Sequence, residues 1–225
     1  MKFLILVAGT NDPSNADFLA DRFAEGIKHH DSSAEITKIR LKDLTIHHFS
    51  LEDYQLGKTI DDDFQKIEDG IKQSDAVVIA SPIWNFSVPA HLKNVIDRMG
   101  SFSLGENRTM GTLEGKPFFF LYTGGSPAPA WPALMRGTLR HMKISIQYFG
   151  GSVVGMDYEG RCTQGKGRFG LVVHERPESI ARMKKKGAGY ATQIDRFLRT
   201  GILPLRYRMS VKIFAWGQRL IRKIV

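Results

Sequence analysis

Apolar residues gather in short runs along this chain of 225 residues. Four of the runs, at 3–8, 76–80, 118–122 and 152–155, are continuous rather than alternating, and turn-forming residues flank them. Such runs are typical of strands that are buried on both faces of a parallel sheet. A fifth run, at 34–41, alternates apolar and polar residues and predicts a half-exposed strand at the edge of that sheet.

Between these runs the apolar positions recur at helical spacing. The segments concerned are 14–29, 60–73, 88–99, 131–149 and 179–198. Because strand and helix alternate, the pattern predicts a doubly wound α/β domain with a parallel sheet and right-handed crossovers. Five strands fit the flavodoxin-like order 2-1-3-4-5, with the alternating second strand at the edge. We expect this domain to span residues 1–200, followed by an extension at 201–225.

Charge is distributed unevenly along the chain. The net charge is +9, yet residues 181–225 hold 12 Lys and Arg against one acidic residue, whereas residues 1–180 hold 20 basic and 22 acidic residues. The basic end predicts an anionic partner, or a helix whose charges lie in solvent.

Several classes of site and location are excluded by composition. The single cysteine, Cys162, excludes an internal disulfide framework and a metal site built from several thiolates. In the pairs His29-His30 and His47-His48 the adjacent side chains point to different faces, and no cluster of acidic residues or cysteines completes a site, so we predict no metal site. No apolar run approaches the roughly 20 residues that span a bilayer, and the N-terminal run is shorter than the core of a signal peptide. We therefore expect a cytoplasmic protein.

The segment from Leu205 onward predicts a basic amphipathic helix. At about 100° per residue, one sector of this helix collects basic residues and another collects apolar residues. The basic set is Arg208, Lys212, Arg219, Arg222 and Lys223, and the apolar set is Met209, Ile213, Trp216, Leu220 and Ile224. One interpretation is that the apolar stripe packs on the body of the protein or on a second copy. Another is that the helix lies on an anionic membrane surface, and an acidic protein is a third; we expect no nucleic acid partner.

Open parallel sheets bind ligands beyond the carboxyl ends of their strands, near the topological switch point. The loop after the first strand contains Thr10 and Asn11 and ends on Ser14 or Asn15 as a helix N-cap. Hydroxyl, amide and free N–H groups at a helix N-terminus favour an anion such as phosphate, although the carboxylate of Asp12 would oppose it. The alternative is a capped turn without a ligand.

Two further loops reach the same edge of the predicted sheet. The loop after the third strand, at 81–87, carries Trp84 and Phe86, either of which could stack on a flat aromatic ligand and add about 0.5–1.5 kcal/mol. The alternative is that these aromatics belong to the core or to a contact with a second copy. The loop after the fourth strand contains Gly124 and Gly125, which would let backbone N–H groups approach a ligand closely, or would form an ordinary turn.

Together these loops resemble the NADPH-dependent FMN reductase family of flavodoxin-like proteins. The second loop carries the most specific match, S-P-I-W-N-F-S-V-P-A-H-L-K-N-V-I-D. The first loop, G-T-N-D-P-S-N, and the fourth strand with its loop, L-E-G-K-P-F-F-F-L-Y-T-G-G, are also similar to the family pattern. The resemblance covers roughly residues 1–200. The chain departs from the pattern at Asn11-Asp12-Pro13, where many relatives carry an arginine in a longer loop.

The resemblance implies FMN at the switch point and NAD(P)H as co-substrate. It assigns the phosphate to Thr10, Asn11, Ser14 and Asn15, the isoalloxazine ring and ribityl chain to Pro82, Ile83, Trp84, Asn85 and Phe86, and the polar edge of the ring to Thr123, Gly124 and Gly125. Of the two aromatics, we expect Trp84 to lie nearer the ring. Flavin hydride transfer needs no side-chain acid or base, so we predict no catalytic residue. The resemblance also implies a homo-oligomer and a small-molecule electron acceptor.

Three functions follow from this reading. The first is a flavin-dependent NAD(P)H oxidoreductase that reduces a quinone, a flavin or a similar small acceptor. The second is a flavodoxin-type electron carrier, and the third is a non-catalytic module at a membrane that has lost the flavin.

The G-x-G-x-x-G pattern at 165–170 lacks the strand and helix of a dinucleotide-binding motif, so we expect a flexible basic loop at 157–177 near the mouth of the site.

Overall fold

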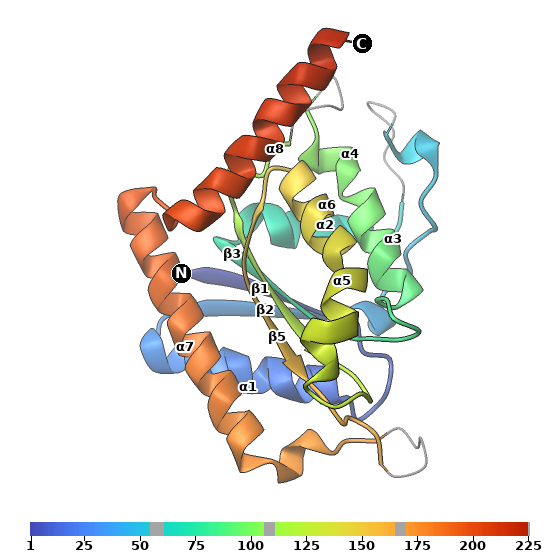
Figure 1. Ribbon diagram of the computed structural model, residues 1–225, viewed down its shortest axis with the longest axis vertical. Helices are drawn as coiled ribbons and strands as arrows, with labels where there is room; N and C mark the ends of the chain where they lie inside the picture. Colours follow the sequence, from blue (N-terminus) through green and yellow to red (C-terminus); the bar gives the residue numbers. More distant parts are fainter. Residues whose placement is uncertain (55–60, 106–110, 165–169, 225) are drawn as a thin grey trace.

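The computed structural model describes residues 1–54, 61–105, 111–164 and 170–224. Its centre is a five-stranded parallel sheet of order β2-β1-β3-β4-β5, which confirms the predicted topology (Figure 1). The strands are β1 (Lys2–Val7), β2 (Glu35–Arg40), β3 (Ala76–Pro82), β4 (Pro117–Thr123) and β5 (Ser152–Glu159). Every residue of β4 is buried, whereas β2 has no buried residue, as its alternating pattern predicts for an edge strand.

Helices cover both faces of the sheet and enclose two apolar cores. On one face lie α1 (Asn15–His30) and α7 (Pro177–Thr200), and on the other lie α2 (Phe64–Gln73), α3 (Ala90–Arg98), α4 (Gly100–Ser103) and α6 (Arg140–Tyr148). Successive strand residues alternate between the cores, so that Leu4 and Leu6 face α2 and α3 while Phe3 and Ile5 face α1 and α7. The first and last helices of this domain approach closely, because a Cβ at Gly187 would lie 2.0 Å from the carbonyl oxygen of Phe23.

The predicted helix at 131–149 is not continuous. It consists of a π-helical turn, η3 (Trp131–Met135), a short α5 (Arg136–Thr138) and α6. Pro132 in the first turn supplies no backbone N–H, and Leu139, with ψ of 5°, leaves the helical conformation before α6 begins. Short helical turns also occur at η1 (Leu41–Asp43), η2 (Leu51–Tyr54) and η4 (Val173–Glu175).

The fifth strand is longer than the apolar run that predicted it. The run ends at Gly155, but β5 continues through Asp157 to Glu159, and it pairs with β4 as far as Thr123 opposite Glu159. Both carboxylates form ion pairs with arginines, which allows charged residues in a largely buried strand. The extension brings the segment after β5 beside the loop that follows β4.

The C-terminal extension forms one helix, α8 (Leu205–Ile224), after a left-handed turn at Gly201 that ends α7. It meets the body through Tyr207, whose hydroxyl donates to the carbonyl oxygen of Val154 at 2.6 Å, and through Gln218, whose amide donates to Tyr148 at 2.8 Å. The apolar stripe does not pack on the body: the exposed fractions are Met209 53%, Ile213 61%, Trp216 64% and Leu220 39%. The interpretation in which the stripe covers its own body is therefore wrong. Within the described residues, no helix combines the length and the hydropathy needed to cross a membrane.

Candidate functional site

A cleft lies at the carboxyl ends of β1, β3 and β4, where the sheet topology places the predicted loops. It encloses about 420 Å³, including open solvent. The first three loops contribute Gly9, Thr10, Asn11, Ser14, Asn15, Ala16, Pro82, Ile83, Trp84, Thr123, Gly124 and Gly125, and the segment after β5 contributes Cys162 and Thr163. Of the twelve predicted site residues, ten thus line one cleft, and Asn85 and Phe86 do not.

The first loop wraps tightly around the start of α1. Ser14 is the N-cap of this helix, with its Oγ accepting from the N–H of Asp17 at 3.4 Å. Gly9 is required by this wrapping, because a Cβ there would lie 2.2 Å from the same Oγ. The first N–H groups of α1 have no partner within the helix, so the loop presents hydrogen-bond donors and the positive end of the helix dipole to the cleft.

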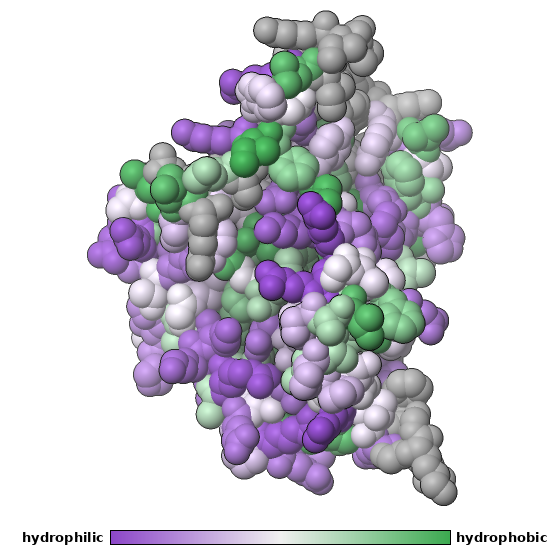
Figure 2. Space-filling model, in the orientation of Figure 1, coloured by the Kyte–Doolittle hydropathy of each residue, from purple (hydrophilic) through white to green (hydrophobic). Residues whose placement is uncertain are grey.

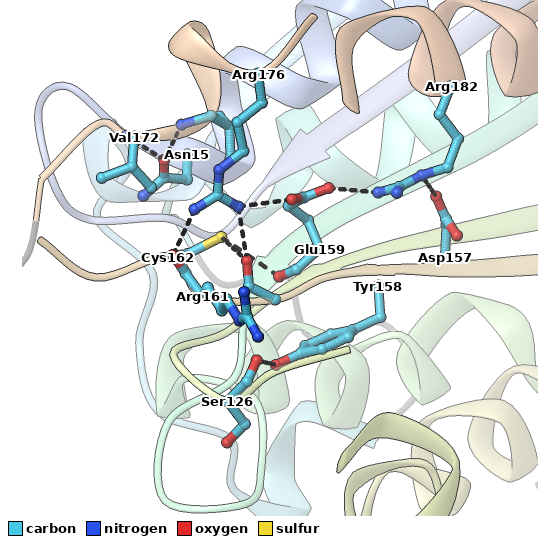
Figure 3. A network of polar contacts seen from close by, with 12 residues as sticks. Asn15, Ser126, Asp157, Tyr158, Glu159, Arg161, Cys162, Val172, Arg176 and Arg182 are labelled. Carbon is cyan, nitrogen blue, oxygen red and sulfur yellow. Dashed lines mark hydrogen bonds and ion pairs between the residues drawn. The ribbon is translucent and has the colours of Figure 1, made fainter. Parts of the chain in front are cut away.

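Asn15 lines the cleft, but its side chain has a structural role that sequence reasoning missed. Its Nδ2 donates to the carbonyl oxygen of Gly170 at 2.7 Å, and its Oδ1 accepts from the N–H groups of Val172 at 2.9 Å and Val173 at 3.2 Å (Figure 3). Asn15 therefore ties the first turn of α1 to the segment before α7. Its backbone N–H is the group that it can offer to a ligand.

Two cations from the end of β2 compensate the carboxylate of Asp12. Lys42 lies 2.8 Å and Arg40 3.3 Å from its Oδ2, and these cations, Lys42 foremost, lower the pKa of Asp12. The pairing of β1 with β2 brings Arg40 opposite Val7, just before the first loop. The repulsion that Asp12 would exert on an anion is thus reduced by neighbours 28 and 30 positions along the chain.

The second loop leaves β3 through a tight turn. Trp84 and Ser87 exchange backbone hydrogen bonds of 2.8 and 2.9 Å, and the two residues between them, Asn85 and Phe86, have φ of 49° and 65°. Left-handed backbone is tolerated by asparagine but costs energy at phenylalanine. The turn leaves Trp84 on the cleft, 36% exposed, and carries Phe86 away from it, 59% exposed.

The third loop is held against the end of β5. The backbone N–H of Gly124 donates to the backbone carbonyl oxygen of Glu159 at 3.0 Å. The backbone N–H of Cys162 donates to the backbone carbonyl oxygen of Gly124 at 2.9 Å. A Cβ at Gly124 would lie 2.8 Å from the hydroxyl oxygen of Tyr158, and one at Gly125 would lie 3.1 Å from Cγ2 of Thr163. Glycine at 124 therefore lets the backbone form the wall of the cleft at this point.

A fourth side of the cleft is formed by Cys162 and Thr163, which lie in the segment 157–177 expected near the mouth of the site but were not predicted as site residues. It is fixed by the buried carboxylate of Glu159, which binds Arg176 at 2.7 Å and also Arg182 (Figure 3). β5 continues beyond its apolar residues to Asp157 and Glu159. A prediction based on apolar runs does not include this polar end, and so it misses the wall that follows it. Residues 165–169 of the predicted loop at 157–177 lie outside the described residues.

Cys162 is the one titratable side chain among the described residues that line the cleft. Burial, and then the neighbouring carboxylate of Glu159, raise the pKa of its thiol to about 11. The thiol therefore stays protonated near neutral pH, donates weakly to the carbonyl oxygen of Glu159 at 3.3 Å, and is a poor nucleophile. The described residues also contain no cluster of three metal-ligating side chains.

Comparison with known proteins identifies relatives of this chain. One curated relative, the FMN-dependent NADH:quinone oxidoreductase of Ruminiclostridium cellulolyticum, is 33% identical over 125 residues, covering 52% of this chain and 55% of the relative. FMN-dependent NADH:quinone oxidoreductase 1 of Photobacterium profundum is 44% identical over 59 residues, covering 24% and 30%. The chain spans less than two thirds of the length of these curated relatives.

A solved structure shares the fold over most of this chain. The NAD(P)H:quinone oxidoreductase from Methanothermobacter marburgensis superposes with a TM-score of 0.67 at 18% identity, over 84% of this chain and 96% of that one. The model of the family described as NADPH-dependent FMN reductase matches residues 1–146, which include the first three loops of the cleft. Because this match covers more than half of the sequence, the chain belongs to the NADPH-dependent FMN reductase family.

Proposed function

We propose that this protein is a flavin-dependent NAD(P)H oxidoreductase that binds FMN in the cleft and passes hydride equivalents from NAD(P)H to a quinone, a flavin or a similar small acceptor. One observation carries the proposal: the three loops that match the family converge with the N-terminus of α1 in one cleft at the switch point of the sheet. The names of the curated relatives support the quinone as acceptor.

The residues of the cleft fit FMN in chemistry. Gly9, Gly124 and Gly125 line the cleft and have no side chain that would keep a ligand away from the backbone. None of the described residues that line the cleft is a lysine or arginine. The phosphate would therefore be held by uncharged donors at a helix N-terminus.

The proposed assignment follows the position of each residue on the cleft. Thr10, Asn11 and Ser14, with the backbone N–H of Asn15, hold the phosphate. Pro82, Ile83 and Trp84 lie along the isoalloxazine ring and ribityl chain, and Thr123, Gly124 and Gly125 meet the polar edge of the ring. Asn85 and Phe86, at the tip of the turn, lie at the rim, where an acceptor or a second copy arrives.

Bound FMN supplies the hydride chemistry, and the chain supplies binding and orientation. Buried Ile83 and the indole of Trp84 exclude water from one side of the site. No side chain on the described wall is suited to proton transfer, since Cys162 keeps its proton. The exposed Arg161, next to the cleft wall in sequence, is the cation that we assign to the phosphates of NAD(P)H.

We further propose a cytoplasmic homo-oligomer that contacts an anionic membrane surface through residues 205–225. The exposed apolar stripe of α8, together with the basic residues of the same segment, supports this contact. A membrane contact would suit a lipophilic quinone, which partitions into the bilayer.

An absorbance spectrum of the purified protein, before and after incubation with FMN, tests the redox function. We expect a yellow protein whose flavin bands bleach anaerobically when NADPH is added without any other reductase. A flavodoxin-type carrier would stay oxidised under these conditions. A colourless protein that takes up no FMN would contradict the proposed function.

A further inference from the structure

A second, larger groove runs between α8 and the α5–α6 segment, over the outer edge of β5. It encloses about 1780 Å³, including open solvent. Figure 1 shows β5 in front of the other strands, between α8 and α6. The floor is mainly apolar, with Val153, Val154 and Met156 from β5 and Phe214 from α8. The groove is separate from the cofactor cleft, with which it shares no lining residue.

One wall of this groove carries three cations. Arg136 from α5 and Arg140 and Lys143 from α6 all line it, and within α6 a spacing of three residues places Arg140 and Lys143 on one side of the helix. None of the three forms an ion pair or side-chain hydrogen bond with any other described residue. By contrast, Arg176 and Arg182, on the other side of β5, are both bound to carboxylates. The positive charge of the groove is thus uncompensated within the described chain.

The groove adjoins the exposed stripe of α8. Ile213 belongs to both surfaces, since it lines the groove and is 61% exposed. On the far side of the stripe lie Lys212 and Arg219, both exposed, which the helical period places next to Trp216. An apolar band therefore lies between two rows of cations, and Figure 2 shows apolar side chains along α8 interspersed with hydrophilic ones.

We propose that this groove binds the headgroup of an anionic phospholipid, with the phosphate at Arg136, Arg140 and Lys143 and the acyl chains over the apolar floor and the α8 stripe. An acidic peptide would pair with the cations but leave the α8 stripe in water. A phospholipid satisfies both, because its phosphate and its hydrocarbon lie next to each other. The inference rests on the membrane contact proposed above. It adds that the α5–α6 cations, and not α8 alone, form the contact surface.

Vesicle sedimentation of the full chain tests the groove directly. The probes are vesicles of phosphatidylglycerol mixed with phosphatidylcholine, and vesicles of phosphatidylcholine alone. The test variant is Arg136→Glu/Arg140→Glu, and the control is Lys28→Glu/Lys66→Glu, which makes the same change of charge at exposed positions outside the groove. A third variant, Met209→Ser/Trp216→Ser, removes exposed apolar side chains of the stripe that do not line the groove. FMN uptake and circular dichroism verify that each variant is folded.

We expect the wild type to bind vesicles that contain phosphatidylglycerol and to ignore phosphatidylcholine alone. The groove variant should bind on the order of tenfold more weakly or worse, and the charge-matched control should bind like the wild type within about threefold. If the groove variant binds as tightly as the control while the stripe variant loses binding, the groove inference is overturned and the membrane contact of α8 stands. If the wild type binds no vesicle, or binds polyglutamate instead, both the groove inference and the membrane contact fall, and the redox function is untouched.

Discussion

Arg176 and Glu159 form an ion pair of 2.7 Å beside the cofactor cleft. The same guanidinium donates to the carbonyl oxygens of Gly160 at 2.8 Å and Arg161 at 2.7 Å (Figure 3). It thereby fixes the backbone that leads to Cys162 and Thr163 on the cleft wall. Cys162, which lines the cleft, and Arg176, which positions it, are distant in the sequence and are brought together only by the fold.

Replacing Arg176 by alanine should weaken both the fold and the flavin site. The change removes the guanidinium donor from the carbonyl oxygens of Gly160 and Arg161 and one of two cations from a carboxylate that is 7% exposed, so we expect a loss of about 1–3 kcal/mol in the free energy of unfolding. The Kd for FMN should rise about 3- to 10-fold as the wall loosens. Urea unfolding of the apoprotein and fluorescence titration with FMN measure the two effects.

Arg199→Ala is the matched control for this prediction. Arg199 forms one ion pair, with Asp195, and its side chain is 72% exposed. Exposed pairs of this kind contribute little, so both quantities should stay within about 0.5 kcal/mol of the wild type. Equal effects of Arg176→Ala and Arg199→Ala would contradict the positioning role.

Gly124→Ala should disturb the third loop. The new Cβ would lie 2.8 Å from the hydroxyl oxygen of Tyr158, a distance that forces the backbone or the ring to move. We expect a loss of about 1–3 kcal/mol in stability and reduced FMN uptake. In a Tyr158→Phe background the same change should cost less, since the colliding oxygen is absent. As a control, Gly137→Ala meets nothing within 4 Å and should be neutral or stabilise by up to about 1 kcal/mol. A Gly124→Ala protein that behaves like Gly137→Ala would refute the steric argument.

The sheet order and the first three loops could be predicted because each depends on local sequence. Continuous apolar runs mark the buried strands, and parallel connection brings their carboxyl ends to one edge, so Thr10, Ile83 and Gly124 fall together without knowledge of side-chain contacts.

The remaining features of the site depend on pairs that are distant in sequence. Asn15 looks like a phosphate ligand until its contacts with 170–173 are known, and Lys42 reaches Asp12 only because β1 pairs with β2. Likewise, the sequence shows that α8 is amphipathic, but whether its stripe meets the body depends on how Tyr207 and Gln218 orient the helix.

We expect Trp84 to affect the binding of FMN and Phe86 to affect the binding of the acceptor. Trp84→Ala should raise the Kd for FMN about 3- to 10-fold, because the indole lines the cleft and stacking on a flat ring contributes about 0.5–1.5 kcal/mol. Phe86→Ala should leave the Kd for FMN within about twofold and raise KM for the acceptor, since the ring lies at the rim. Flavin titration and steady-state kinetics with a soluble quinone measure these constants. The reverse result, with Phe86 controlling FMN affinity, would overturn the assignment.

His91 should make stability depend on pH. Its Nε2 lies 2.9 Å from the carbonyl oxygen of Ala8, just before the first loop, and burial lowers its pKa below 6.5 although that hydrogen bond opposes the shift. Because the unfolded chain then binds a proton more readily than the folded one, the stabilising contribution is complete above about pH 6.5 and is lost as the pH falls toward the folded pKa.

His91→Gln keeps a donor for Ala8 and removes the titration. We expect the free energy of unfolding of the wild type to fall more steeply than that of this variant between about pH 7 and pH 5, with a difference in slope of at most about 1.4 kcal/mol per pH unit. Urea unfolding at a series of pH values measures both slopes. His29→Gln, which removes an exposed imidazole on α1, is the control for the loss of a histidine. Parallel slopes for the wild type and His91→Gln would contradict the lowered pKa of this half-buried imidazole.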